Sequence, residues 1–493
     1  MFDMSFSFKT GALKAPTLGV MKTPAATVCP HHAALSGVPA TPTLHQPGSW
    51  PPGPPSGITG WSLLLRMSRD LLGTMEEWRQ RHGDLVHLRI WPEHEIVVTD
   101  PQLVRELLVD HHDSLIRWER GINVFSQLHG HSVLTAEGAP WQAKRRALQG
   151  SFMPKSVQSF VPVIAAAAGA ALSQWQTGGE DSPIESAFNS LGMDVILRMM
   201  FSSEIDAEAR LAERAVQDSS VAANAEMYWP ASWPDAMPWK RRKREAVRTL
   251  KRLMDRHIQA RLALAPALWP PDVLSRLLAL HFENAADWPL QAVRDECMTA
   301  FLAGHDTAAA SLTWWAWCMA ANPAAQLAAQ QEVTAVLGDR IPTVEDLPAL
   351  TYLHQTLRET QRLYPAAPVL LSRRSTRPIT LGGWQLPART IFFVPLRLMH
   401  QDARWFPEPH RFRPERFAVG APEIPRGAFM PFGAGPRVCL GQHLAMAEMT
   451  VVAAMFLQRF SVTVPDAMKA PEPVFNITLR PDVPLRLKLA RRQ

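Results

Sequence analysis

The alternation of apolar and polar residues predicts a small amount of β-sheet. The segment LVHLRI (residues 85–90) and the segment EIVVTD (residues 95–100) are typical of two strands joined by a turn. The segment ITLGGWQLPARTIFFVPL alternates in the same way, and we expect a hairpin whose bend lies at Gly382 and Gly383. These stretches are short, so the sheet is expected to be a minor part of the fold.

Helical periodicity dominates the chain from residue 101 to about residue 362. A long helix is expected over about 290–322. A second begins near 347 and ends before Pro365, because the residue before a proline disfavours the helical conformation. A third helical pattern begins at Leu440, whereas RWFPEPHRFRPERF is broken by prolines and is expected to be a loop. The predicted fold class is therefore mainly α with a minor β region.

The composition divides the chain into a tail and one large domain. Residues 1–48 are rich in Pro, Ala and Thr and lack periodicity, so we expect a disordered tail. A proline-rich stretch, SWPPGPPSGITGW, leads out of this tail. No second linker follows, and residues 49–493 are predicted to form a single domain, although length alone suggests roughly three.

The overall composition indicates a soluble, cytoplasmic protein. It is 47% hydrophobic and 19% charged. We find no stretch that approaches the ~20 apolar residues of a membrane span, and no secretory signal. The four cysteines, Cys29, Cys297, Cys318 and Cys439, form no CxxC pair, so neither a zinc site nor a disulfide framework is indicated.

The net charge of +6 is a local feature. Residues 240–261 carry ten Lys or Arg and two Asp or Glu, so the rest of the chain has 51 − 10 = 41 basic and 45 − 2 = 43 acidic residues. A nearly neutral remainder argues against a nucleic-acid partner.

Cys439 is the residue whose surroundings point most clearly to a chemical role. It precedes the helical pattern that begins at Leu440, where free N–H groups and the helix dipole favour a thiolate. Such a thiolate can be a nucleophile, a redox centre or a metal ligand. The nearby Gly433 and Gly435 let the backbone approach a flat group, and Arg437 can pair with an anion. An iron porphyrin satisfies all of these features, with sulfur on iron and arginine on a propionate.

The segment FGAGPRVCLG resembles the haem-binding loop of the cytochrome P450 superfamily, which has Phe, two Gly, Arg, Cys and Gly at this spacing. The resemblance extends over about residues 50–490. It implies a soluble bacterial-type member with a helical prism around a buried haem b (iron protoporphyrin IX). Cys439 would be the iron ligand, and Arg437, Phe432 and Gly433 would contact the cofactor. The plain alternative is a small buried cysteine beside a turn.

Two further segments resemble the support of that loop. In ETQR, Glu359 and Arg362 are three residues apart and share a helix face, although the same spacing describes many solvated pairs. In FRPERF, the resemblance implies that Arg416 completes a buried Glu–Arg–Arg cluster.

The segment AGHDTA resembles the oxygen-binding part of the family's central helix. Ala303 and Thr307 share a face, and the small residues Ala303 and Gly304 leave room for dioxygen. Thr307 can donate a hydrogen bond to the oxygen, and Asp306 can relay protons from water. The family often has a second hydroxyl residue where this chain has Ala308, which leaves the detail of the relay open. The plain alternative is a helix with a glycine and a chance Asp-Thr pair.

Several polar residues are further candidates for the haem propionates. The segment WQAKRR resembles the family's pair of Trp and Arg four residues apart, here Trp141 and Arg145. Either Arg373 or Arg374 is a further candidate, and the spacing does not decide between them. His400 can reach a propionate or can be an ordinary satisfied loop histidine.

The resemblance also implies an apolar pocket and a lid. A lipophilic substrate such as a fatty acid or terpenoid is favoured, although each pocket residue can equally be ordinary core. The segment 227–244, which is rich in Trp and then Lys and Arg, would be a substrate gate or a weak membrane contact. The alternative is a packed aromatic loop before a solvated helix. The proposed pocket residues are Phe125, Leu128, Phe301, Ala303, Val369, Leu370 and Ile477.

These features predict a haem-thiolate monooxygenase that uses dioxygen to hydroxylate or epoxidise a lipophilic molecule. Electrons are expected from a separate ferredoxin or flavodoxin with its NAD(P)H reductase. The alternatives are a peroxygenase, an isomerase or dehydratase, and a non-catalytic haem sensor, none of which needs the Asp306–Thr307 pair.

Overall fold

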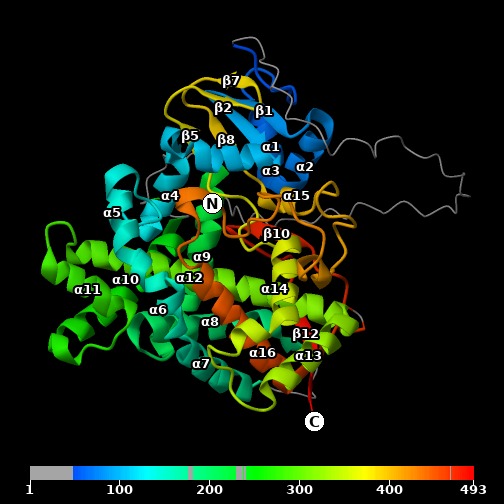
Figure 1. Ribbon diagram of the computed structural model, residues 1–493. Helices are drawn as coiled ribbons and strands as arrows, with labels where there is room; N and C mark the ends of the chain where they lie inside the picture. Colours follow the sequence, from blue (N-terminus) through cyan, green and yellow to red (C-terminus); the bar gives the residue numbers. More distant parts are fainter. Residues whose placement is uncertain (1–47, 176–180, 229–236, 238–239, 467, 493) are drawn as a thin grey trace, which may run out of the picture. The chain divides into compact units, whose positions relative to one another are not determined.

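The computed structural model describes residues 48–175, 181–228, 237, 240–466 and 468–492. These residues belong to one compact unit that runs from Leu44 to Gln493. The predicted tail lies outside the described residues except for Gly48. The prediction of a mainly α fold with a minor β region is confirmed (Figure 1).

The helices account for most of the described chain. They are α1 (Trp61–Arg69), α2 (Leu71–His82), α3 (Pro101–Arg105), α4 (Glu119–His129), α5 (Gly138–Gln149), α6 (Pro154–Gln158), α7 (Val161–Ser173), α8 (Ile184–Phe201), α9 (Ala207–Tyr228), α10 (Arg241–Leu262), α11 (Val273–Glu283), α12 (Leu290–Ala321), α13 (Pro323–Leu337), α14 (Thr351–Leu363), α15 (Leu396–His400) and α16 (Gln442–Arg459).

Among the described residues, the strands form one five-stranded sheet and three smaller ones. They are β1 (Leu85–Ile90), β2 (Glu93–Val98), β3 (Leu115–Arg117), β4 (Ser182–Pro183), β5 (Arg373–Ser375), β6 (Ile379–Leu381), β7 (Trp384–Leu386), β8 (Ile391–Phe393), β9 (Phe460–Thr463), β10 (Pro473–Asn476), β11 (Thr478–Pro481) and β12 (Arg486–Arg491). The strand orders are β1-β2-β8-β5-β3, β4-β12-β9, β6-β7 and β10-β11.

The predicted strand pair and hairpin are both present. β1 has the predicted bounds, whereas β2 begins two residues early, because Glu93 and His94 pair with Ile90 and Arg89 across the hairpin. The second hairpin bends at Gly382 and Gly383, whose φ angles of 56° and 82° suit glycine.

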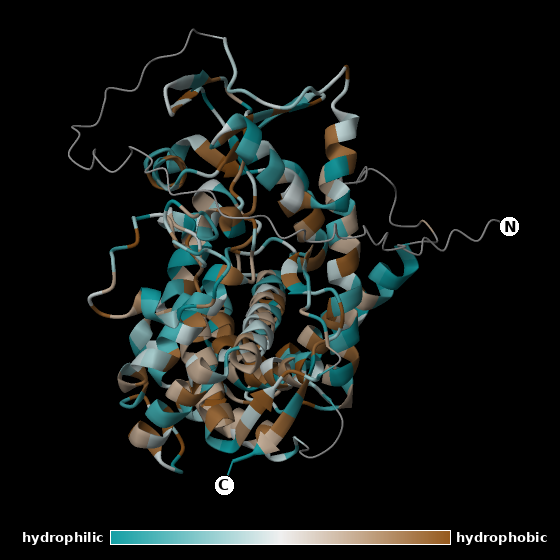
Figure 2. Cartoon of the chain, turned by 90° about the vertical axis from the view of Figure 1, so that its right-hand side faces the viewer, coloured by the Kyte–Doolittle hydropathy of each residue, from teal (hydrophilic) through white to brown (hydrophobic). Residues whose placement is uncertain are grey.

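The central helix α12 agrees closely with the predicted 290–322 and packs along α8. Its C-terminal half is held by two buried tryptophans. Trp314 Nε1 donates to the carbonyl of Leu479 in β11 (2.9 Å), and Trp315 Nε1 donates to Thr356 Oγ1 in α14 (3.0 Å). These bonds hold α12 against β11 and α14. Figure 2 shows apolar residues along many of the helices.

One expectation about membrane spans is corrected. Residues Pro154–Ser173, in α6 and α7, are long and apolar enough to cross a membrane by length and composition. α7 packs against α16 and α8, and Ile164, Ala168 and Leu172 lie in the main core. Core packing therefore explains their apolar character.

The positively charged segment, residues 240–261, is not a uniformly solvated helix face. Lys243 Nζ contacts Glu226 Oε2 on α9 (2.6 Å), and Lys240 Nζ contacts Glu226 Oε1 (3.3 Å). Each of the two lysines is only 8% exposed. The three tryptophans of the predicted gate, at positions 229, 233 and 239, lie outside the described residues.

Candidate functional site

Cys439 lies in a tightly constrained loop before α16. Its N–H donates to the carbonyl of Phe432 (2.9 Å), which closes the loop. Gly433 and Gly435 have φ angles of 76° and 72°. A Cβ at Gly435 would lie 2.2 Å from the carbonyl oxygen of Leu108, so this position excludes any side chain.

The structure changes the expected electrostatics of Cys439. Its side chain is accessible to solvent, yet burial among protein atoms raises the pKa of the thiol. The N–H of Gly441 and the charge of Arg145 oppose this rise without reversing it. The start of the helix therefore does not by itself lower the pKa of the Cys439 thiol. The other two described cysteines, Cys297 and Cys318, are buried in the core.

Arg437 and Arg145 hold the Cys439 loop against α5. The Arg437 guanidinium lies over the Trp141 ring, 4.1 Å from its centre. Arg437 also forms an ion pair with Glu137. Arg145 Nη1 donates to the carbonyl of Val438 (2.8 Å). The predicted residues Trp141, Arg145 and Arg437 are thus brought together beside the cysteine.

Arg117 is a site residue that sequence reasoning missed. It is 7% exposed, and its Nε and Nη1 have no hydrogen-bond partner. β3 places it directly opposite Arg373 of β5. Burial, followed by the charges of Arg437 and Arg373, lowers the pKa of Arg117 well below its usual value. No local motif marks this residue, because strand pairing alone creates its environment.

The same pairing distinguishes Arg373 from Arg374. The pKa of Arg373 falls to about 10, through burial and the charge of Arg437. Arg374 instead forms ion pairs with Glu93 (2.7 Å) and Glu119 (2.6 Å). Arg373 therefore belongs to the cluster beside Cys439, and Arg374 does not.

These residues fit a haem. We call Arg117, Arg145, Arg373 and Arg437 the arginine cluster. Buried N–H groups without acceptors and an excess of positive charge are costly unless an anion satisfies them. Two carboxylates would do so, and the sulfur of Cys439 is a suitable iron ligand.

The predicted oxygen-binding face of α12 borders accessible space. Ala303 is exposed, although Leu302 and His305 on the same helix are buried. Thr307 Oγ1 donates to the carbonyl of Ala303 (2.8 Å). Gly304 also packs against α8, where a Cβ would lie 2.7 Å from Ile196 Cδ1, and its role in leaving room for dioxygen stays a prediction. That glycine permits close helix packing.

Asp306 is tied to the C-terminal hairpin by contacts that sequence reasoning missed. Its carboxylate forms an ion pair with Arg480 of β11 and accepts from Thr478 Oγ1 (2.9 Å). Arg480 also contacts Glu185 on α8 (2.9 Å). Arg480 shows no local motif, and 174 positions separate it from Asp306. Any proton transfer at Asp306 therefore takes place beside a guanidinium.

The predicted Glu–Arg–Arg cluster is assembled in the interior. Glu359 and Arg362 are both fully buried, with Arg362 Nη2 and Nε each 2.8 Å from a carboxylate oxygen. Arg416 Nε lies 3.3 Å from Glu359 Oε1. The same oxygen accepts from the N–H of Arg413 (2.9 Å), so the cluster joins α14 to the following loop.

His400 is placed near this support instead of in the arginine cluster. Its Nε2 accepts from the N–H of Met430 (3.1 Å), and its carbonyl accepts from Arg362 Nη1 (2.8 Å). The bond to Met430 holds the segment that leads into the Cys439 loop, whereas Nδ1 of His400 is buried without a hydrogen-bond partner. A contact between His400 and a propionate stays a prediction.

The proposed pocket residues other than Ala303 lie on α12, on α4, in the β10–β11 hairpin and after α14. Phe301 is fully buried in the main core, and the centre of its ring lies 5.6 Å from that of His305, so its place in the pocket stays a prediction. Its position, two residues from Ala303, turns it about 200° around the helix, away from the exposed face. Phe125 and Leu128 are buried on α4, and Ile477 forms the bend of β10–β11 with a φ of 63°.

The remaining two pocket candidates lie after α14. Val369 packs in the same apolar cluster as Phe475 of β10. Leu370 packs against a different cluster, and its Cδ2 lies 3.5 Å from the position a Cβ would take at Gly433.

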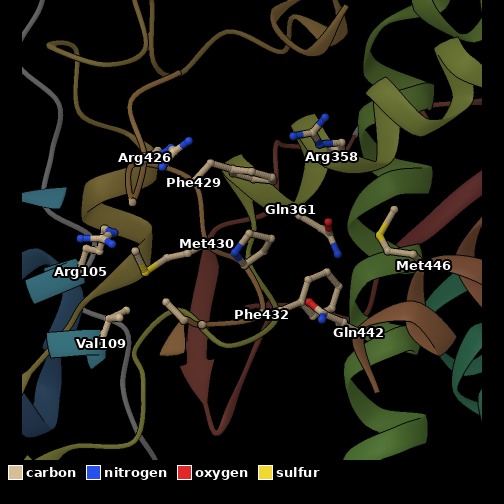
Figure 3. Close-up of a pocket in the computed structure, with 14 residues that line it drawn as sticks. Arg105, Val109, Arg358, Gln361, Arg426, Phe429, Met430, Phe432, Gln442 and Met446 are labelled. Carbon is tan, nitrogen blue, oxygen red and sulfur yellow. The ribbon is translucent and has the colours of Figure 1, made fainter. Parts of the chain in front are cut away.

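A pocket of about 570 Å³ lies beside the segment that leads to Cys439. Figure 3 shows Arg105, Arg358 and Arg426 around Phe429 and Phe432. Arg358 lies over the Phe417 and Phe429 rings, and burial lowers the pKa of its guanidinium. A second pocket of about 440 Å³ is lined by Trp141, Arg145, Arg146 and Val438, among others. Both pockets present arginines beside the cysteine loop.

Comparison with known proteins agrees with this geometry. A family model described as cytochrome P450 matches residues 51–489. Cyclooctat-9-en-7-ol 5-monooxygenase of Streptomyces melanosporofaciens is 32% identical over 412 residues, which cover 79% of this chain and 87% of the relative. Cytochrome P450 734A4 of Oryza sativa subsp. japonica is 31% identical, over 80% of this chain and 79% of the relative. Protein LUTEIN DEFICIENT 5, chloroplastic, of Arabidopsis thaliana is 26% identical, over 83% and 72%.

Proposed function

This chain belongs to the cytochrome P450 family, and from that premise we propose that it is a monooxygenase that inserts one atom of dioxygen into a lipophilic small molecule. The observation that carries the proposal is the accessible Cys439 thiol beside the arginine cluster, whose unsatisfied N–H groups suit the two propionates of haem b. When bound, the haem supplies the redox chemistry that activates dioxygen, with two electrons and two protons consumed and the second oxygen atom released as water.

The residues of this chain have separate tasks in that reaction. Cys439 would hold the iron, and the arginine cluster would hold the propionates. The tight loop from Phe432 to Cys439 fixes the sulfur. The Thr307 hydroxyl would turn from the carbonyl of Ala303 and donate a hydrogen bond to dioxygen. Asp306 would carry protons from solvent towards Thr307. Arg480 and Thr478 hold the Asp306 carboxylate in a fixed position beside this path.

A terpenoid-like substrate is the finer proposal. It is supported by the apolar residues Phe125, Leu128 and Ile477 and by the names of two relatives, which refer to cyclooctat-9-en-7-ol and to lutein. The relatives also include bacterial proteins, which supports a cytoplasmic location.

The test is turnover of a terpenoid and fatty-acid library with a surrogate ferredoxin and its reductase under isotopically labelled dioxygen. One labelled oxygen atom per product is expected by mass spectrometry. Product made only with added peroxide would favour the peroxygenase, and product without incorporated oxygen would favour the isomerase or dehydratase. Haem without any turnover would favour the sensor. Cys439→Ser should lose the red-shifted Soret band of the reduced carbonyl complex.

The electron donor is proposed to be an acidic ferredoxin or flavodoxin that docks over the two arginine-lined pockets. Arg105, Arg358 and Arg426 surround the larger pocket, next to the chain segment that leads to the sulfur. Exposed charges act mainly within a Debye length of about 8 Å at physiological salt, so electron transfer should slow as salt rises.

Charge reversal tests this docking surface. Arg105→Glu and Arg426→Glu should slow the first electron transfer and reduce its salt dependence. The matched control is Arg241→Glu on α10, an exposed arginine on an element that lines neither pocket. Equal effects in all three variants would place the donor elsewhere.

A further inference from the structure

Glu137 occupies an unusual position beside the arginine cluster. It is the N-cap residue of α5, yet its side chain makes no hydrogen bond to its own helix. Its Oε1 instead accepts from the backbone N–H of Arg117 (3.1 Å) and lies 3.9 Å from Arg117 Nη1. Its Oε2 forms the ion pair with Arg437. The Glu137 carboxylate therefore contacts the arginine cluster and not the N-terminus of its own helix.

The charge balance of the arginine cluster depends on Glu137. Among the described residues, Glu137 is the carboxylate that contacts the arginine cluster. Four positive charges therefore face one negative charge. Burial, followed by the charge of Arg437, lowers the pKa values of Arg117 and Arg373. In the haem-free protein, Glu137 therefore relieves part of the repulsion among these arginines.

The contacts of Arg437 place Glu137 in competition with a second carboxylate, a haem propionate. Both terminal nitrogens of Arg437 already donate, Nη1 to the carbonyl of Ala136 (3.2 Å) and Nη2 to Glu137. A bidentate carboxylate requires two parallel N–H groups of one guanidinium. These two contacts leave three of the five N–H groups of Arg437 for a propionate, but Glu137 already neutralises part of the charge that would attract it.

We propose that Glu137 is an internal counter-ion that stabilises the haem-free chain and competes with a haem propionate for Arg437 and Arg117. The inference rests on the haem-binding part of the proposed function. It gives Glu137 two effects of opposite sign. Removing its charge destabilises the haem-free protein and strengthens the retention of haem. A residue that merely oriented the arginines for the cofactor would weaken haem retention when removed.

The experiment measures both effects in Glu137→Gln, which keeps the side-chain shape and removes the charge. Haem loss from the purified holoprotein is followed as transfer to excess apomyoglobin, and urea unfolding is measured on the haem-free chain. A charge-assisted hydrogen bond leads us to expect haem loss slower by roughly tenfold, together with a lower urea midpoint. The matched control is Glu93→Gln, which removes a carboxylate from Arg374 outside the cluster and should leave haem loss unchanged.

Haem loss that is unchanged or faster in Glu137→Gln would overturn the proposal. If that variant does not accumulate, Glu137→Asp decides, because its shorter carboxylate should shift both measurements in the same directions by less. The reduced carbonyl spectrum of the wild type is recorded separately. Absence of its red-shifted Soret band would refute haem-thiolate ligation itself, and would be distinguished from a failure of the Glu137 proposal.

Discussion

Replacing Glu359 with glutamine tests whether the buried ion cluster supports the cysteine loop. The carboxylate accepts four hydrogen bonds in a fully buried position, two from Arg362, one from Arg416 and one from the N–H of Arg413. In Glu359→Gln an amide nitrogen replaces one oxygen and faces N–H donors. The Arg362 guanidinium then remains buried without a counter-charge, with carbonyl acceptors only.

The expected loss of stability follows from this arrangement. Breaking one partner of a buried ion pair costs about 3–5 kcal/mol, a large share of the stability of an ordinary domain. The perturbation should also reach the cysteine, because Glu359 holds the backbone of Arg413 and thereby the loop that runs on towards Met430. We expect part of the protein to lose haem during purification.

Urea unfolding of the haem-loaded protein, followed by far-UV circular dichroism, measures the free energy of unfolding. The matched control is Glu408→Gln, which removes an exposed carboxylate paired with Arg411 and Arg413 in the same loop and should change nothing measurable. A loss in Glu359→Gln below about 1 kcal/mol would refute the reasoning, since it would mean that the interior solvates Arg362 without the carboxylate.

Three further predictions concern the oxygen side and the sheet. Thr307→Ala should bind substrate with an unchanged spin shift but release more peroxide per product, and unchanged coupling would place the proton donor elsewhere. Arg480→Gln leaves Asp306 without its cation and should cost about 2 kcal/mol in urea unfolding while altering the solvent isotope effect on turnover; an unaltered isotope effect would remove Asp306 from the relay. Burial, with the charge of Glu93 second, raises the pKa of Glu95 to about 8 from 4.5. The folded state then holds a proton that the unfolded state has lost, so stability falls as pH rises from about 4.5 through 8. Glu95→Gln should flatten that fall in urea midpoints measured between these pH values, and parallel curves would contradict it.

Local chemistry allowed several features to be predicted from the sequence. The Cys439 loop is recognisable because its glycines, Arg437 and the following helix form one continuous stretch. Glu359 and Arg362 are three residues apart, so helix geometry alone brings them together. The bounds of α12 and β1 followed from periodicity.

Contacts between distant segments decided the rest. Arg117 became a site residue only because β3 pairs with β5 and sets it opposite Arg373. Arg480 reaches Asp306 across 174 positions, and Glu137 reaches Arg437 across 300. Lys243 appears from the sequence to belong to a solvated positive run, yet packing of α10 on α9 buries it against Glu226. A side chain's neighbours in sequence determine its helix or strand face, whereas burial and charge depend on which other segment covers that face, and only the tertiary structure contains that information.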